Sequence, residues 1–201
     1  MKRLVTLAFG YLMSGFMWVA PANANIVTNG GFETGNFNGW SLSGDTAFSG
    51  VGSIPPSPSD FASSGTNFAY FNTTQGVQIE QDLATVTGAN YLVEFMLRYV
   101  GLDDPAVQGD FGVGFIDGKK PFLLVQLQFP AYGQYGHYQY VTTATTSSLT
   151  KLLFVFTTGS GKSAFLLDDV SVSLSRVPTP ATIALLGLGL VGIGATRRKR
   201  A

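Results

Sequence analysis

The feature that most constrains the fold is the lack of sustained helical periodicity between residues 25 and 174. Short runs rich in Val, Ile, Phe, Tyr and Thr recur there, and Gly, Pro, Asn and Ser interrupt them, which is the pattern of strands joined by turns. In the run 91–99 every odd-numbered residue is hydrophobic, whereas the even-numbered set contains Glu94 and Arg98, as expected of a strand with one solvated face. The sequence therefore predicts an all-β fold, a two-sheet antiparallel β-sandwich of the jelly-roll type.

Turn-forming residues divide this region into strands and one long loop. The segment 44–65 is rich in Ser, Gly and Pro and is predicted to be that loop. The predicted strands cover residues 67–72, 77–83, 91–99, 110–115, 122–128, 138–144, 151–157 and 164–174.

Two short motifs near the ends of the β-rich span resemble those of carbohydrate-binding-module-like jelly rolls. The run NGGFETG at 29–35, followed by Gly39-Trp40, is similar to the first strand and turn of such domains. The run FLLDDVSV at 165–172 is similar to their last strand. Because the motifs bracket the domain, the resemblance implies a jelly roll over nearly all of 25–174. It does not imply a ligand, since this fold hosts many functions.

Residues 1–24 have the pattern of a secretory signal peptide. Lys2-Arg3 forms a positive start, residues 4–20 are largely apolar, and Ala22-Asn23-Ala24 supplies a small-x-small cleavage pattern. We expect a signal helix that is removed, so that the mature chain begins at Asn25 with a domain covering 25–176. The alternative is an N-terminal membrane anchor that is not cut.

The segment 177–201 has three parts. Val177-Pro178-Thr179-Pro180 precedes an apolar stretch at 181–196, and a basic tail at 197–201 begins with Arg197 and Arg198. As a helix the apolar stretch would reach about 24 Å at 1.5 Å per residue. That length is short of a hydrocarbon core of roughly 30 Å, so the arginines would snorkel or the bilayer would be thin. A transmembrane helix is predicted, with the basic end on the cytoplasmic side.

This order resembles the PEP-CTERM sorting signal, a proline-containing motif followed by a short transmembrane helix and an Arg-rich end. The resemblance implies handling by exosortase and association with exopolysaccharide. Thr179 stands where the family has glutamate, and a plain tail anchor is the alternative. Together the two ends predict an exported protein, first held in the inner membrane by its C-terminal helix and then found at the cell surface or outside the cell.

The charge of the central domain limits its partners. Residues 25–176 contain six basic and twelve acidic side chains, a net charge of −6, which would repel phosphate backbones and argues against nucleic-acid binding. Such acidity is compatible with Ca²⁺ and with neutral sugars. The chain has no cysteine, which excludes disulfides and thiolate metal sites. The domain must therefore be stabilised by its own core.

A structural Ca²⁺ site is the first candidate. On the predicted last strand, alternation places Asp168 on the same face as Val170 and Val172, where an unpaired carboxylate is costly. In the resembled modules the first and last strands lie close together and a structural Ca²⁺ often bridges them, so the resemblance implies metal ligands at Glu33, Asp168 and Asp169. Ca²⁺ prefers oxygen ligands of this kind. The alternative is that Asp168 caps turn amides without a metal.

A glycan site is the second candidate. Residues 129–140 contain four tyrosines together with amide and imidazole groups, and sugar recognition needs flat rings beside hydrogen-bonding groups. Tyr132 and Tyr135 are predicted to lie in a turn and to project outward beside Gln134. Tyr138 and Tyr140 are expected to face a core, as is Trp40. Packing alone is the alternative for all of these aromatics.

Catalytic groups are few. His137 is the only histidine, so a zinc site and a Cys-His pair are excluded. Asp103-Asp104 and Asp110 could imitate paired glycosidase carboxylates, but the Pro-Ala-Val sequence between them indicates a solvated loop. The chain is therefore predicted not to be an enzyme.

Three functions remain. The first is a non-catalytic envelope or matrix protein associated with exopolysaccharide. The second is a carbohydrate-binding module with a specific glycan ligand, and the third is a polysaccharide-active enzyme. A concave groove lined with exposed aromatic side chains would favour the second over the first.

Overall fold

The computed structural model describes residues 24–53, 61–101, 109–116, 133–145 and 149–175. The strands in these ranges are β1 (Ser41–Gly44), β2 (Ser49–Ser53), β3 (Asn67–Phe71), β4 (Val77–Ala84), β5 (Asn90–Gly101), β6 (Asp110–Ile116), β7 (Tyr135–Thr143), β8 (Leu149–Thr157) and β9 (Ser163–Leu174). The predicted strand at 122–128 and the sorting segment at 177–201 lie outside the described residues, as does nearly all of the predicted signal peptide. No helix among the described residues is long and apolar enough to cross a membrane.

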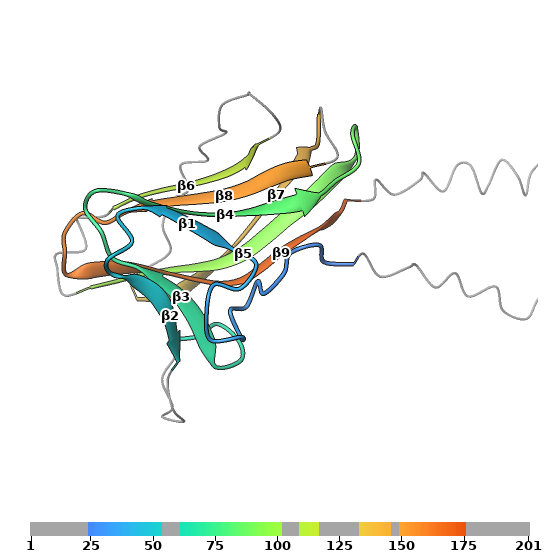
Figure 1. Cartoon of the computed structure of the whole chain (residues 1–201). Coiled ribbons are helices and arrows are strands. Elements are labelled where there is room, and N and C mark those ends of the chain that lie inside the picture. Colours follow the sequence, from blue (N-terminus) through green and yellow to red (C-terminus); the bar gives the residue numbers. More distant parts are fainter. Residues whose placement is uncertain (1–23, 54–60, 102–108, 117–132, 146–148, 176–201) are drawn as a thin grey trace, which may run out of the picture.

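The strands form two sheets that lie face to face (Figure 1). One sheet has the order β1-β4-β8-β6, and the other has the order β2-β3-β9-β5-β7. Every strand pair is antiparallel. The prediction of an all-β sandwich with two antiparallel sheets is confirmed.

Strands β3 to β9 lie on predicted strands, but β1 and β2 were missed. The error at β2 arises because its sequence, SGVGS, has the composition of a loop, and the predicted loop at 44–65 contains it. Packing explains the glycines. A Cβ on Gly50 would lie 2.5 Å from Tyr70 Oη, and one on Gly52 would lie 2.7 Å from Phe68 Cζ. The two aromatic rings of β3 therefore lie over the glycines of β2.

The core between the sheets is rich in aromatic side chains. Phe71 of β3 stacks on Phe156 of β8 with centroids 4.3 Å apart and planes 7° apart. Phe95 of β5 meets Phe154 of β8 edge to face at 5.2 Å. All four side chains are fully buried. These pairs join strands of opposite sheets, so they fix how the sheets pack.

The first and last described residues lie at the same end of the sandwich (Figure 1). The amide of Ile26 donates to the carbonyl of Val172 on β9 at 2.9 Å. The Asn25 Oδ1 atom accepts the N–H of Val172, also at 2.9 Å. The start of the domain therefore runs beside its last strand, antiparallel to it. The opposite end carries the β1–β2 and β3–β4 loops.

Replacing Phe71 with alanine should lower the free energy of unfolding by about 3–5 kcal/mol, because it leaves a cavity against Phe156. Val86→Ala, at an exposed site, should change it by less than about 0.5 kcal/mol. Urea unfolding of both variants measures the difference. Equal stabilities would mean that this stacked pair does not hold the sheets together.

Candidate functional site

Glu33, Asp168 and Asp169 meet at one corner of the molecule, around Gly31. A Cβ built on Gly31 would lie 3.7 Å from both Asp168 Oδ1 and Glu33 Cγ, and 4.0 Å from Asp169 Oδ1. The segment at 29–35 that carries Glu33 forms turns rather than the expected first strand, and Asn29 and Phe32 have positive φ angles of 54° and 56°. The structure thus brings together the three carboxylates that the sequence selected. We call this group the carboxylate corner.

A β-bulge decides where Asp168 points. In the β5–β9 pair Glu94 lies opposite Ser171, but Met96 lies opposite Asp168, so two residues of β9 occupy the place of one. Asp169 accommodates the extra residue with a φ of 50°. Leu167 and Val170 both belong to the core, and Asp168 therefore lies on the outer face. The prediction that Asp168 shares the core face with Val170 and Val172 is wrong, because strict alternation fails at the bulge.

Asp168 is nevertheless fully buried, with 0% exposure, because the loop that precedes β3 covers it. Its Oδ2 atom accepts the backbone N–H groups of Ser63 at 2.7 Å and Ser64 at 3.2 Å. Its Oδ1 atom accepts the N–H of Asp169 at 2.7 Å. Burial raises the pKa of Asp168 to about 6, and the neighbouring charge of Asp169 adds to this, although the amide hydrogen bonds oppose it. This arrangement matches the alternative reading of Asp168 as a cap for turn amides.

Glu33 anchors the end of the same loop. Its Oε1 atom accepts the N–H groups of Thr66 at 2.9 Å and Asn67 at 3.0 Å. Its Oε2 atom accepts from Thr66 Oγ1 at 3.0 Å and from Asn67 Nδ2 at 3.1 Å. Burial raises the pKa of Glu33, but these hydrogen bonds outweigh it and hold the pKa below its ordinary value. Glu33 and Asp168 thus tie one loop to two distant parts of the chain.

The donor set of the corner has the chemistry that Ca²⁺ prefers, since all of the groups are hard oxygens. Glu33 already accepts four hydrogen bonds, which is about the capacity of a carboxylate. Asp168 accepts three, and Asp169 accepts one, from Ser64 Oγ at 2.5 Å. The described residues contain no group of three or more acidic, His or Cys side chains at metal-binding spacing. An ion here would depend on the free lone pairs of the two aspartates and on backbone carbonyls.

The predicted glycan residues have different surroundings. Tyr132 lies outside the described residues, and Gln134 is exposed in a bend. Tyr135 is the first residue of β7 rather than part of a turn, and it is half-buried. Its hydroxyl donates to the Phe61 carbonyl at 2.5 Å, and the Arg98 guanidinium lies 5.8 Å from its ring centre. Burial and the carboxylate of Asp168 raise the pKa of Tyr135. Tyr135 therefore lies in a strand rather than in the predicted turn, and its ring and hydroxyl take part in packing on the outer side of the sheet.

The expectations for the other aromatic residues are confirmed. Tyr138 stacks on Phe95 at 5.5 Å with planes 16° apart, and Tyr140 packs against the same core. Trp40 is buried, and its Nε1 donates to the Asn29 carbonyl at 3.2 Å. These rings stabilise the fold and are not free to bind a ligand.

A hollow of about 240 Å³ lies at the end of the sandwich opposite the termini, and sequence reasoning missed it. Three loops that are far apart in sequence line it, through Asp45, Phe48, Asn72, Thr73, Thr74, Gln75 and Gly161. The Phe48 side chain is 69% exposed, the highest value among the large hydrophobic residues that the structure describes as exposed. The signal in the sequence was a lone Phe within a run of Ser, Gly and Thr, which alternation cannot detect.

Hydrogen bonds hold the three loops of the hollow together. Thr73 Oγ1 donates to Asp45 Oδ2 at 2.6 Å, and the Asn72 amide donates to the Phe48 carbonyl at 3.1 Å. Asn72 Nδ2 donates to the Gly161 carbonyl at 3.1 Å. The hollow is therefore preformed, with an aromatic ring, a carboxylate and amide groups at its rim.

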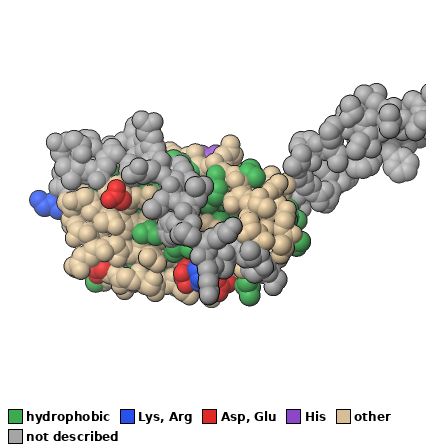
Figure 2. Space-filling view, turned by 90° about the horizontal axis from the view of Figure 1, so that it is seen from above, with side chains coloured by type: hydrophobic (Ala, Val, Ile, Leu, Met, Phe, Trp, Pro, Cys, Tyr) green, Lys and Arg blue, Asp and Glu red, His purple; other side chains and the backbone are tan. Residues whose placement is uncertain are grey.

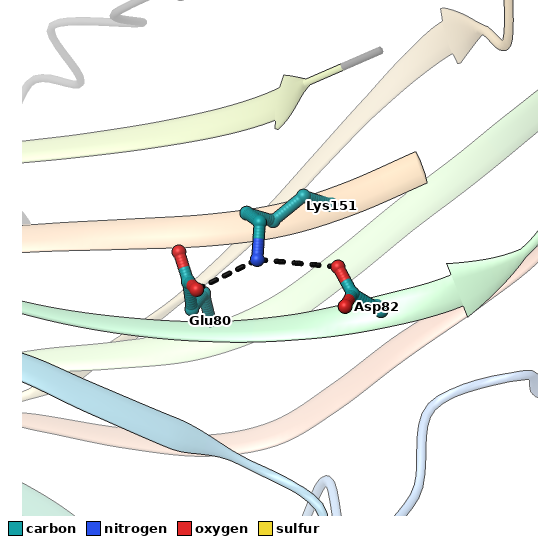
Figure 3. Close-up of polar contacts among 3 residues, drawn as sticks. All are labelled: Glu80, Asp82 and Lys151. Carbon is teal, nitrogen blue, oxygen red and sulfur yellow. Dashed lines mark hydrogen bonds and ion pairs between the residues drawn. The ribbon is translucent and has the colours of Figure 1, made fainter. Parts of the chain in front are cut away.

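Charged side chains on the outer faces of the sheets form ordinary ion pairs, and His137 is among them. Lys151 of β8 reaches between two carboxylates of β4, with Nζ 2.6 Å from Glu80 Oε1 and 3.2 Å from Asp82 Oδ1 (Figure 3). His137 Nε2 lies 3.4 Å from Glu94 Oε1 on an exposed part of the sheet. Asp103-Asp104 lie outside the described residues, and Asp110 is exposed at the start of β6. Partly exposed pairs of this kind contribute little stability.

Comparison with solved structures identifies the type of fold. No protein-family model matches the sequence, and a search of curated proteins finds no match. Among solved structures, the chain is similar to carbohydrate-binding modules with jelly-roll folds.

The carbohydrate-binding module TmCBM61, solved in complex with β-1,4-galactotriose, is 19% identical with a TM-score of 0.62, over 76% of this chain and 99% of that chain. The CBM22-1 xylan-binding domain of Xyn10C from Paenibacillus barcinonensis is 18% identical with a TM-score of 0.52, over 78% and 97%. A cyclase from Fischerella sp. TAU is 13% identical with a TM-score of 0.57, over 78% and 100%. At these identities the similarity shows a jelly-roll β-sandwich, a fold shared by binding modules and by an enzyme.

Replacing Glu33 with glutamine should lower the free energy of unfolding by about 1–2 kcal/mol, because the new NH₂ group would face the donors of Thr66 and Asn67. Glu94→Gln, which makes the same chemical change at a partly exposed site, should alter it by less than about 0.5 kcal/mol. Urea unfolding compares the two. If both variants matched the parent protein, Glu33 would not anchor the loop.

Proposed function

We propose that this chain is an exported, non-catalytic domain that binds a glycan. The observation that carries the proposal is the preformed hollow beside the exposed ring of Phe48, at the end of a fold shared with carbohydrate-binding modules. Small-molecule sites combine apolar or aromatic walls with a few placed polar groups. The Phe48 ring offers a flat surface for a sugar ring, and Asp45, Asn72 and Gln75 offer groups for its hydroxyls.

The size of the hollow suggests what it would take. Its volume of about 240 Å³ is below the roughly 300–1,000 Å³ of sites for drug-sized ligands. A terminal sugar of a chain, or a short segment, suits it better than a long polymer lying in a groove. Gln134 and Tyr135, with Tyr132, remain a second candidate surface for the same function.

Export and sorting form the second part of the proposal. The signal peptide at 1–24 would carry the domain out of the cytoplasm, and the segment 177–201 would hold it in the inner membrane. The PEP-CTERM-like motif at 177–180 would make exosortase a partner and deliver the domain to the cell surface or its exopolysaccharide. A polysaccharide-active enzyme is the less favoured candidate, because the paired carboxylates among the described residues are engaged with Lys151 or with the loop amides.

Binding to a glycan array that contains β-1,4-galactan and β-1,4-xylan oligosaccharides tests the proposal. Phe48→Ala should weaken binding by about tenfold or more, as expected when an aromatic contact residue is truncated. Val86→Ala, a similarly exposed site at the opposite end, should bind as the parent does. Both variants should keep the melting temperature, because both side chains are exposed.

The outcomes separate the two candidate sites. Loss of binding in Gln134→Ala but not in Phe48→Ala would mean that the glycan binds at the start of β7 and not in the hollow. An absence of binding across the array would contradict glycan recognition and would leave a structural role in the envelope.

We also propose that Ca²⁺ binds at the carboxylate corner through Asp168 and Asp169, with Glu33 holding the loop beside it. A cation that binds only the folded state raises its stability, so the melting temperature should be higher in CaCl₂ than in EDTA. Asp169→Asn should remove most of that difference. The Asp169→Asn substitution should not change stability in EDTA. Asparagine tolerates the φ of 50° and retains a side-chain oxygen that can accept the hydrogen bond from Ser64 Oγ.

Asp82→Asn, which removes a distant exposed charge, is the matched control and should keep the Ca²⁺ effect. Identical melting in CaCl₂ and EDTA would mean that the corner works as a cap for turn amides alone.

A further inference from the structure

Four aliphatic side chains are exposed at or near the end of the sandwich that contains the first and last described residues. Val86 is 64% exposed, Val141 59%, Leu149 58% and Leu174 42%. The strand register places them there. Leu149 lies opposite Ala84 at the end of β4, and Leu174 lies opposite Tyr91 at the start of β5. Most of the large aliphatic residues exposed in the described part of the chain thus gather in one region, which we call the proximal end.

The described residues of the proximal end carry no charge. These residues, 24–27, 84–92, 140–145, 149–150 and 172–175, include no Asp, Glu, Lys or Arg. In Figure 2 the atoms of this end that are not grey have the colours of hydrophobic and other uncharged groups. The first charged side chains inward from it are Asp82, Glu94 and Lys151. The described residues of this end thus differ from the domain as a whole, whose net charge over 25–176 is −6.

The length of chain after the last described residue limits how far the apolar stretch can lie from the proximal end. Ser175, the last described residue, donates its N–H to the Asn90 carbonyl at 2.8 Å, so β9 remains attached up to that point. Only 176–180 separate it from the apolar stretch at 181–196. At about 3.3–3.6 Å per residue that connection spans at most roughly 20 Å. A bilayer that holds the stretch therefore lies within that reach of the proximal end.

The same end faces a membrane if the N-terminal segment is the anchor. Ile26 is paired with Val172, and the preceding residue Asn25 contacts Val172 as well. The apolar stretch at 4–20 therefore connects to the proximal end as well. The geometry does not depend on which terminus is retained in the bilayer.

We propose that the proximal end is a lipid-contacting surface, with Val86, Leu149 and Leu174 entering the headgroup region while the chain is anchored. Burial of apolar side chains at that boundary lowers the free energy in proportion to the buried area. An acidic domain is repelled by anionic lipid, and the uncharged end is the surface that can approach it at least cost. The hollow beside Phe48 then points away from the bilayer, because it lies at the opposite end of the strands.

Site-specific fluorescence tests the proposal, because the chain has no cysteine and any introduced one is unique. Val86→Cys and Leu149→Cys in the full chain are each labelled with an environment-sensitive dye. The control is Thr46→Cys in the exposed β1–β2 turn at the opposite end. Each is reconstituted into vesicles of phosphatidylethanolamine and phosphatidylglycerol that contain brominated lipid. We expect a blue shift and quenching for the two proximal labels and neither for the control.

A charge variant provides the second measurement. Val86→Asp, read through the Leu149→Cys label, should reduce the quenching by lipid, because it places an anion at the bilayer surface. Val86→Asn is the matched uncharged polar control and should retain more of the quenching by lipid. Neither change should lower the melting temperature, since Val86 is exposed.

Three results would overturn the proposal. The first is equal quenching of the proximal and control labels. The second is a failure of the chain to float with the vesicles. The third is a blue shift that persists in detergent without lipid and grows with protein concentration, which would mean that a second copy of the chain covers this end. None of these readouts depends on glycan binding.

Discussion

The described part of the molecule depends on the irregular pairing of β9 with β5. Because two residues of β9 lie opposite Phe95, Asp168 turns away from the core while Val170 returns to it. The outward carboxylate then accepts amides from Ser63 and Ser64, and the amide of Val170 donates to the Gly30 carbonyl at 3.0 Å. One bulge therefore holds the covering loop, the N-terminal turns and the central strand of the sheet. Bulges of this kind re-aim side chains at the positions where a fold needs them.

The two ends of the sandwich differ in chemistry as well as in position. One end has an exposed aromatic ring beside a carboxylate and amide groups, in a hollow fixed by hydrogen bonds between loops. The described residues of the other end are uncharged, include exposed aliphatic side chains and contain the first and last residues that the structure describes. Antiparallel strands that run between the ends separate these surfaces by the length of the sandwich. A domain built in this way would present a binding surface outward while its base lies near a bilayer.

Runs of β-branched and aromatic residues between turn residues were sufficient to find β3 to β9, because these strands contribute many such side chains to the aromatic core. This pattern failed at β2, where Gly50 and Gly52 are needed beneath the rings of Tyr70 and Phe68 and so resemble a loop. The motifs around Glu33 and Asp169 correctly indicated that these residues meet. The hydrogen bonds that the carboxylates accept could not be predicted. The backbone N–H groups that donate them belong to residues roughly thirty and a hundred positions away in the chain.

The sequence by itself determined the class of fold, the absence of thiol and histidine-rich chemistry, and the apolar, cation-flanked ends. Those properties depend on residue type and local spacing, which are written directly in the chain. Only the tertiary structure decided that Asp168 faces outward, that Tyr135 is used in packing and that Phe48 is left uncovered beside a hollow. Each of these outcomes depends on which distant segment packs against the residue. Strand pairing and register set those neighbours for the whole chain at once.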